Sequence, residues 1–249
     1  MIDREPEPNK LACEEKSEEN KEILEYEKEE APAFRGILYE HPKAKHSFVV
    51  IFFVALCVLL SLSFWFSPHY SKWLWASKEA VFEKHEYWRL FTALFTHADI
   101  KHLLSNMPLF VVFGWLLRSY FGLLAFPLAA FLVGAVTNYA TLYYYPEHTR
   151  LIGASGVVYG LVGLWVTFYL RYEVRYSFRM KLFRVLGVSM VLLLPTTYSP
   201  TTSYLAHALG FLFGVLCALL LMLTGIYDKK QRALQIEPGE NNLDEKGRQ

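Results

Sequence analysis

The 249-residue chain has few of the residues that indicate a disulfide-rich, metal-binding or secreted protein. Its three cysteines, Cys13, Cys57 and Cys217, lie far apart, and two of them are inside apolar runs, so neither a disulfide framework nor a metal site is expected. The N-terminus is acidic and lacks a basic region followed by an apolar one, which argues against a cleaved signal peptide.

Strong net charge is also lacking, because the total is only +1, but the charges are unevenly spread. Residues 1–46 hold 13 acidic and 8 basic side chains, and the remainder holds 11 acidic and 17 basic ones. Residues 1–45 are predicted to be an acidic, disordered or loosely helical cytosolic tail. The basic residues of the remainder lie between apolar runs, where they indicate membrane orientation and no nucleic-acid partner.

Apolar side chains are abundant instead: 53% of the residues are hydrophobic and 16% are aromatic, more than a soluble domain of this size carries. The first apolar run is long enough to span a bilayer core of about 30 Å. We predict an all-α polytopic membrane protein with a six-helix domain at residues 46–227 and a polar cytosolic tail at 228–249. The predicted segments are residues 46–67, 101–117, 122–145, 153–170, 182–196 and 204–227.

The basic residues of the loops predict the orientation of these segments. The loop between the fourth and fifth segments is rich in arginine, and basic residues also follow the sixth segment, whereas the loop after the fifth has none. Both termini are therefore expected in the cytosol, which requires an even number of spans, such as six. The long outer loop, residues 68–100, mixes aromatic and charged side chains and is predicted to lie in the membrane interface.

Polar side chains cluster at the outer ends of three segments, where they are costly and tend to be functional. The second segment begins with His102 and Asn106, one helical turn apart. The fourth begins with Ser155, and Tyr159 follows one turn later. The sixth begins with His207. Together they predict a polar site that is submerged in the membrane and open to one side.

The helical rise gives the depth of this site. Ser155 is 16 residues from Arg171, and His102 is 16 residues from Arg118, so both lie about 24 Å from the cytosolic interface. That is several ångströms short of crossing the core. For His207 the next charged residue is 21 residues away, or about 31 Å, so a tilted or overhanging helix has to be assumed.

Small residues on the fourth and sixth segments predict that these helices pack closely. Ser155 and His207 would then lie about one turn outward from the contact and could pair as nucleophile and general base. His102, Asn106 and the free N–H groups at a helix N-terminus are candidate oxyanion donors. The small residues are Gly156, Gly160, Gly163, Gly210 and Gly214.

Taken singly, these features have simpler explanations: a serine beside glycine is usually packing, and His102 with Asn106 can be interhelical glue. In combination, "GASG" at the fourth segment, "H-x-x-x-N" at the second, "AHxxGxxxG" at the sixth and "EYWR" in the outer loop resemble the rhomboid intramembrane serine proteases. The resemblance covers residues 46–227 and implies a six-transmembrane-helix rhomboid-like bundle. It makes Ser155 the nucleophile and His207 its general base. The oxyanion would be bound by His102, Asn106 and the backbone N–H of Ser155.

The resemblance also assigns supporting roles. Tyr159 would stack on the catalytic histidine, Trp88 and Arg89 would brace the outer loop, and Gly210 and Gly214 would pack the sixth helix on the fourth. His97 has a family counterpart that suits a structural role better than a catalytic one. One departure is Arg118, which stands where many relatives have a structural glutamate.

Other classes fit less well. A zinc protease would need an H-E-x-x-H motif, which is absent. An intramembrane aspartyl protease would need two aspartates inside the segments, and there is none. An α/β-hydrolase would need a G-x-S-x-G motif, but Val157 stands at the position of its last glycine. A six-helix transporter would predict an internal repeat, and none is found. The main alternative is an inactive rhomboid-like protein that binds membrane clients for trafficking or degradation, but such relatives generally lack the serine or the histidine.

We therefore expect a protease that hydrolyses single-span membrane proteins near the outer face. Its expected partners are these transmembrane substrates and the lipid bilayer, with no cofactor, metal or nucleic acid. A bacterial inner membrane is the simplest location, and a eukaryotic secretory-pathway membrane is the alternative.

Overall fold

The computed structural model describes residues 36–39, 41–193 and 203–240. Within these ranges the chain is helical, and the one pairing of extended backbone is an isolated antiparallel bridge between Ala76 and Leu151. The predictions for residues 1–35, for most of the loop after the fifth segment and for the last nine residues lie outside the described residues.

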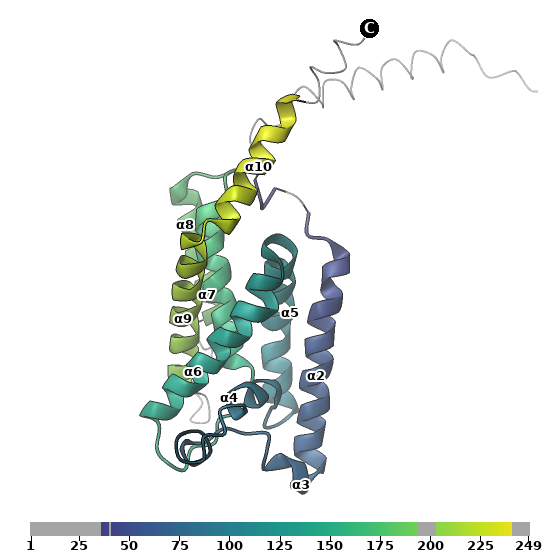
Figure 1. The fold of residues 1–249 in the computed structure, drawn as a ribbon, viewed down its shortest axis with the longest axis vertical. Helices are drawn as coiled ribbons and strands as arrows, with labels where there is room; N and C mark the ends of the chain where they lie inside the picture. The colour runs from purple at the N-terminus through teal and green to yellow at the C-terminus, as the bar shows by residue number, and fades with distance from the viewer. Residues whose placement is uncertain (1–35, 40, 194–202, 241–249) are drawn as a thin grey trace, which may run out of the picture.

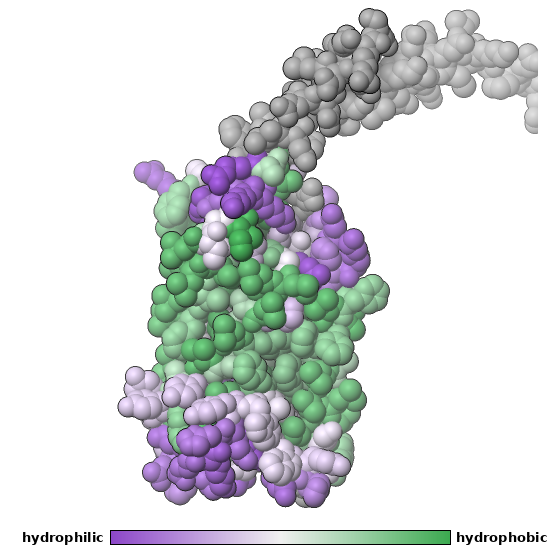
Figure 2. Space-filling model, viewed as in Figure 1, coloured by the Kyte–Doolittle hydropathy of each residue, from purple (hydrophilic) through white to green (hydrophobic). Residues whose placement is uncertain are grey.

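Long helices run up and down the molecule (Figure 1), and on the face shown in Figure 2 apolar side chains form a belt between two polar ends. The central helix, α7 (Ser155–Tyr172), packs against three of its neighbours, which are α5 (Ile100–Leu123), α6 (Ala130–Tyr144) and α9 (Tyr204–Leu223). A further helix, α10 (Ile226–Glu240), extends from the end of the bundle that carries the N-terminal segment. The long helices are α2 (Ser47–Phe66), α5 (Ile100–Leu123), α6 (Ala130–Tyr144), the central α7 (Ser155–Tyr172), α8 (Phe178–Leu193) and α9 (Tyr204–Leu223).

Three helical stretches among the described residues are long and apolar enough to span a membrane: Ala44–Phe66, Ile100–Tyr144 and Tyr204–Leu223. The second has 45 residues, or about 68 Å of helix, roughly twice the bilayer core. It reverses direction between α5 and α6, so it contains two passes through the bundle (Figure 1). Helix α7 contacts protein on most sides, so its side chains need not be as apolar as those of a helix that faces lipid. Six membrane crossings stay a prediction.

Backbone breaks explain where the predicted helix boundaries were wrong. The second helix continues to Leu123 instead of ending at residue 117. The third begins at Ala130 instead of residue 122, because Gly122 has φ 77° and Phe126 is extended.

The sixth helix ends at Leu223 because Gly225 has φ 67°, and the chain then starts α10. The predicted polar tail therefore continues as a helix as far as Glu240. The break also removes the need for a tilted sixth helix. His207 lies 16 residues before Leu223, the same spacing that was found for Ser155 and Arg171.

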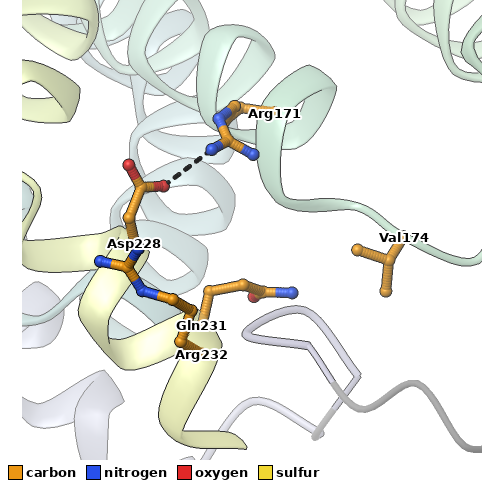
Figure 3. Close-up of a pocket in the computed structure, with 5 residues that line it drawn as sticks. All are labelled: Arg171, Val174, Asp228, Gln231 and Arg232. Atoms are coloured by element: carbon orange, nitrogen blue, oxygen red, sulfur yellow. Dashed lines mark hydrogen bonds and ion pairs between the residues drawn. The ribbon is translucent and has the colours of Figure 1, made fainter. Parts of the chain in front are cut away.

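Part of the N-terminal segment is already packed before the first long helix, within the predicted tail of residues 1–45, and the domain division at residue 45 stays a prediction. Ile37 and Leu38 are 3% and 4% exposed, and the Ile37 N–H donates to Oε1 of Gln231 on α10 at 2.8 Å. Helix α10 is fixed in turn, because Tyr227 donates its hydroxyl to the carbonyl of Phe121 at 3.0 Å. Figure 3 shows the polar side chains of this corner.

The outer loop, which was predicted to lie in the membrane interface, forms short helical turns at the opposite end of the bundle (Figure 1). Tyr87, Trp88 and Phe91 are exposed there, as expected of side chains that face a membrane interface, although that location stays a prediction. The turns are α3 (Pro68–Ser71), η2 (Glu79–Glu83), α4 (Arg89–Thr92) and η3 (Ala93–Phe95).

Candidate active site

Ser155 is the first residue of α7 and is half-buried, next to the free N–H groups of the helix N-terminus. The turn before it requires glycine at position 153 for two reasons. Gly153 has φ 118°, and a Cβ there would lie 2.6 Å from Cε1 of His102. The His102 ring therefore packs directly on the backbone that leads into Ser155.

His97 fixes the residue immediately before the serine. Its ring is fully buried, and Nε2 accepts a hydrogen bond from the Ala154 N–H at 3.3 Å. Because Nε2 is an acceptor, the ring proton must be on Nδ1, which donates to Oγ of Ser61 at 3.2 Å. Burial, with a further contribution from the neighbouring His102, lowers the pKa of His97 to about 3, so this neutral form persists at physiological pH.

The partner of His97, Ser61, was not predicted from the sequence. Ser61 is fully buried in α2 and also accepts a hydrogen bond from the His97 backbone N–H at 3.1 Å. Its signal was present, because a serine inside an apolar helix is a polar residue at membrane depth. His97 thus joins α2 to the turn before α7.

Helices α7 and α9 meet backbone to backbone along their glycine faces. A Cβ added at Gly210 would lie 2.5 Å from the carbonyl oxygen of Gly156, and one added at Gly214 would lie 2.3 Å from that of Gly160. Both helices begin at the same end of the bundle, so they run in parallel. The contact leaves Ser155 one residue, and His207 three residues, outward from the Gly156–Gly210 pair.

His207 is held between aromatic rings. The Tyr159 ring stacks on it, with centroids 4.1 Å apart and planes 11° from parallel, and Tyr204 contacts its edge at 6.1 Å. Neither the Ser155 hydroxyl nor the His207 ring forms a hydrogen bond with another described residue, so the Ser–His bond stays a prediction. Catalytic hydrogen bonds are often long before substrate binds and tighten in the complex.

The candidate oxyanion donors lie at the start of α5. Asp99 caps this helix by accepting the His102 N–H at 2.8 Å, and the His102 ring contacts His97 edge-on at 5.2 Å. Asn106 is buried, and its Nδ2 donates to the His102 carbonyl oxygen at 2.9 Å. An amide nitrogen has two hydrogens, so one Asn106 donor is left for a ligand.

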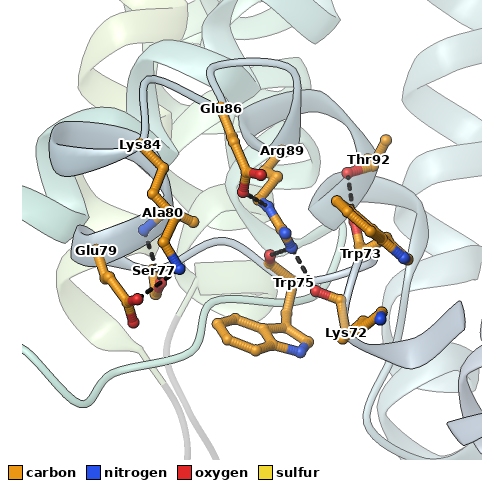
Figure 4. Close-up of polar contacts among 10 residues, drawn as sticks. All are labelled: Lys72, Trp73, Trp75, Ser77, Glu79, Ala80, Lys84, Glu86, Arg89 and Thr92. Carbon is orange, nitrogen blue, oxygen red and sulfur yellow. Dashed lines mark hydrogen bonds and ion pairs between the residues drawn. The ribbon is translucent and has the colours of Figure 1, made fainter. Parts of the chain in front are cut away.

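The outer loop is organised around Arg89, which is 7% exposed (Figure 4). Its guanidinium donates to Oε2 of Glu86 at 2.5 Å, to the carbonyl oxygen of Trp75 at 3.2 Å and to that of Lys72. It also lies over three tryptophan rings, with Trp88 the nearest at 4.9 Å. Trp88 and Arg89 were predicted from the sequence, whereas the part played by Trp75 was not.

Two contacts join this loop to the segment that leads into Ser155. Ala76 and Leu151 exchange both backbone hydrogen bonds, at 3.0 and 2.8 Å. The guanidinium of Arg150 lies 4.5 Å from the ring centroid of Trp75. The loop is thus coupled to the candidate nucleophile through the backbone.

Arg118 lies far from this site, toward the opposite end of α5, and its buried Nε has no hydrogen-bond partner among the described residues. Within the same residues no group of three histidine, cysteine or acidic side chains is arranged to bind a metal ion. The structure therefore brings Ser155, Tyr159, His207, His102 and Asn106 to one end of the bundle and leaves Arg118 at the other.

Comparison with known proteins matches residues 84–224, more than half of the chain, to the rhomboid domain. The chain is 27% identical over 147 residues to RHOMBOID-like protein 1 of Arabidopsis thaliana, covering 59% of this chain and 38% of that protein. It is 26% identical over 167 residues to RHOMBOID-like protein 7 of the same plant, covering 64% and 50%. It is 32% identical over 122 residues to "Putative rhomboid protease YdcA" of Bacillus subtilis (strain 168), covering 47% and 61%.

The chain thus spans about half the length of these relatives. The rhomboid match runs from the outer loop to the end of α9 and includes all the residues gathered at the candidate site. The long apolar helices of the chain are those expected of an integral membrane protein. We conclude that this chain is a member of the rhomboid family.

Proposed function

We propose that this protein is an intramembrane serine endopeptidase that cleaves single-span membrane proteins near the outer face. Oγ of Ser155 attacks the scissile carbonyl carbon while the His207 ring takes its proton. The C–N bond then breaks, and His207 returns the proton to the leaving amine. Water, deprotonated by His207, hydrolyses the acyl-enzyme and restores Ser155.

One observation carries this proposal: His207 stacks on Tyr159 beside the glycine contact that aligns α7 with α9. A general base needs a fixed orientation, which a carboxylate provides in a triad. The acidic residues nearest in sequence to this end, Asp99 and Glu147, lie outside the helices, and Asp99 is engaged as a cap. Stacking on Tyr159 would replace the carboxylate in orienting His207.

The oxyanion of the tetrahedral intermediate would be bound by the Ser155 N–H, the free Asn106 amide hydrogen and His102. This role is supported by the free N–H groups at the start of α7 and by the packing of the His102 ring on Gly153. The chemistry needs no cofactor.

Substrate would enter as a transmembrane segment that unwinds locally, helped by small or helix-breaking residues. A peptide bond inside a helix has its carbonyl bonded to a later N–H, so attack requires that bond to open. We assign the enzyme to a bacterial inner membrane, with a eukaryotic secretory-pathway membrane as the alternative.

The test compares purified wild type with Ser155→Ala and His207→Ala in detergent, using a model transmembrane substrate and a fluorophosphonate probe. Ser63→Ala is the matched control, because among the described residues that hydroxyl bonds only to the Leu59 carbonyl within its own helix. We expect cleavage and labelling in wild type and in the control, and neither in the two site variants. A folded wild type that neither labels nor cleaves would favour the client-binding alternative.

A further inference from the structure

A polar cavity lies at the end of the bundle opposite Ser155, where the end of α7 meets α10 (Figure 3). Its volume is about 250 Å³. It is smaller than the roughly 300–1,000 Å³ of sites for drug-sized ligands, so it suits a small polar group. Its lining residues are Arg171, Val174, Asp228, Gln231 and Arg232.

Gln231 presents a buried donor to this cavity. The side chain is 8% exposed, and its Oε1 accepts the Ile37 N–H at 2.8 Å. A backbone N–H needs an acceptor, so this bond identifies the other amide atom as Nε2. That nitrogen is buried and has no hydrogen-bond partner within the described part of the chain. An unpaired buried donor indicates a missing acceptor.

The charges that line the cavity favour an anion as that acceptor. Arg171 pairs with Asp228 at 3.0 Å, so this carboxylate is already neutralised. Arg232 also lines the cavity and forms no ion pair with any residue in the described ranges. In Figure 3 its guanidinium lies on the Asp228 side of the cavity, whereas the Gln231 amide points toward Val174. The site therefore offers one uncompensated guanidinium, a second guanidinium and an amide donor. Arginine forks match the geometry of phosphate oxygens.

We propose that this cavity binds a phosphate group. With the predicted orientation it opens at the cytosolic surface, where two sources supply that chemistry: the headgroup of a phospholipid in the inner leaflet and soluble phosphate. Basic cavities between helices on this side of a membrane are suited to lipid headgroups. The inference does not depend on the proposed protease activity.

The experiment uses the full chain in maltoside detergent and measures binding by native mass spectrometry and by calorimetry. One arm titrates phosphatidylglycerol, and the other titrates inorganic phosphate. Gln231→Glu keeps the acceptor for the Ile37 N–H but replaces the donor with a carboxylate oxygen. Arg232→Gln removes the free guanidinium from an exposed position. Lys229→Gln is the matched control, because it removes one exposed positive charge from the same helix outside the cavity.

We expect binding by wild type and Lys229→Gln, affinity about tenfold weaker in Arg232→Gln, and no binding in Gln231→Glu. Lipid binding that excess inorganic phosphate does not displace identifies the headgroup as the source, and saturation by phosphate alone identifies the soluble ion. Equal affinity in wild type and Arg232→Gln, or no binding of either probe to folded wild type, would overturn the proposal.

Discussion

At the scale of single residues, Asn106 has one amide hydrogen in use and one available. We expect Asn106→Ala to slow turnover by up to about 10²–10³-fold if the free hydrogen is a principal oxyanion donor. The loss should fall on kcat more than on KM, because the interaction forms in the transition state. Steady-state cleavage of a model transmembrane substrate measures both constants.

Ser105→Ala is the control for this variant. The Ser105 hydroxyl donates at 2.8 Å to the same His102 carbonyl that accepts from Asn106, but Ser105 itself is exposed. Removing it should leave turnover nearly unchanged. If both variants lost activity equally, Asn106 would act by supporting the helix backbone and would have no oxyanion role.

His97 makes a separate prediction about pH. Its pKa is lowered to about 3 in the folded protein, from an ordinary value near 6.5, so between these values the unfolded chain binds a proton that the folded chain does not. Stability should thus be independent of His97 above about pH 6.5 and fall below it by up to about 1.4 kcal/mol per pH unit. Thermal unfolding of wild type and His97→Gln in detergent, from pH 8 to 5, measures this contribution.

The variant should lose part of the acid sensitivity, since glutamine does not titrate. Identical pH profiles would mean that the pKa of His97 is the same in the folded and unfolded chain, so that the folded protein takes up its proton in the same pH range. That result would also contradict its role as acceptor for the Ala154 N–H.

Candidate site residues could be proposed from the sequence, but the partners that the structure gives them could not. Ser155, Tyr159 and His207 follow from polar residues beside glycine in apolar segments. The contacts of His97 with Ser61 and Ala154 join positions 36 and 57 residues apart. Local spacing carries no information about such pairs, and the ring tautomer emerges only when both are known.

At the scale of helices, the contact between α7 and α9 depends on side chains that are absent. We expect Gly214→Ala to destabilise the protein by about 1–3 kcal/mol, because the new methyl group would lie 2.3 Å from the Gly160 carbonyl and force the helices apart. Cleavage should fall as well, since that displacement changes the spacing of Ser155 and His207. Thermal unfolding and activity are the two measurements.

Gly187→Ala is the matched control on α8, where an added Cβ meets nothing within 4 Å. There alanine should be neutral or stabilising by up to about 1 kcal/mol, as its helix propensity predicts. Equal effects of the two substitutions would show that propensity, and not the contact, governs position 214.

Helix existence was predictable and helix ends were not. Apolar runs in the sequence indicate the long helices, because helices that face lipid or the protein core carry mostly apolar side chains. The ends depend on backbone conformation at Gly122, Phe126 and Gly225, where the residues on both sides remain apolar or helix-forming. The sequence therefore stays apolar across each helix break, and only the backbone dihedral angles φ and ψ show where the helix ends.

At the scale of the whole molecule, six passes with both termini in the cytosol predict a definite labelling pattern. A fluorescent protein fused after residue 249 should fold and fluoresce in the cytosol, and a cysteine introduced at exposed Tyr87 should react with an impermeant maleimide from outside. The same reagent should fail to reach a cysteine at exposed Arg179 in intact cells. Three predicted spans separate these positions, so labelling of both from one side would require an even number of spans between them and would contradict the prediction.

The domain boundaries were less predictable than the membrane domain. Ile37 and Leu38 are two apolar residues in an acidic stretch, too few to mark an ordered segment by composition. Their burial depends on Gln231, 194 positions away in the sequence from Ile37, and on α10. Long-range packing of this kind decides where a tail ends and a domain begins.

The glycine contact between α7 and α9 also separates the reaction at Ser155 from the admission of a membrane substrate. No side chain stands between the helices at Gly156 and Gly160, so no rotamer change can alter their separation. The reacting groups consequently form one stiff body, and whatever admits a substrate must move around that body. Acylation of Ser155 by a small soluble reagent should thus be indifferent to bilayer thickness and fluidity, whereas the capture of a membrane helix should depend on both.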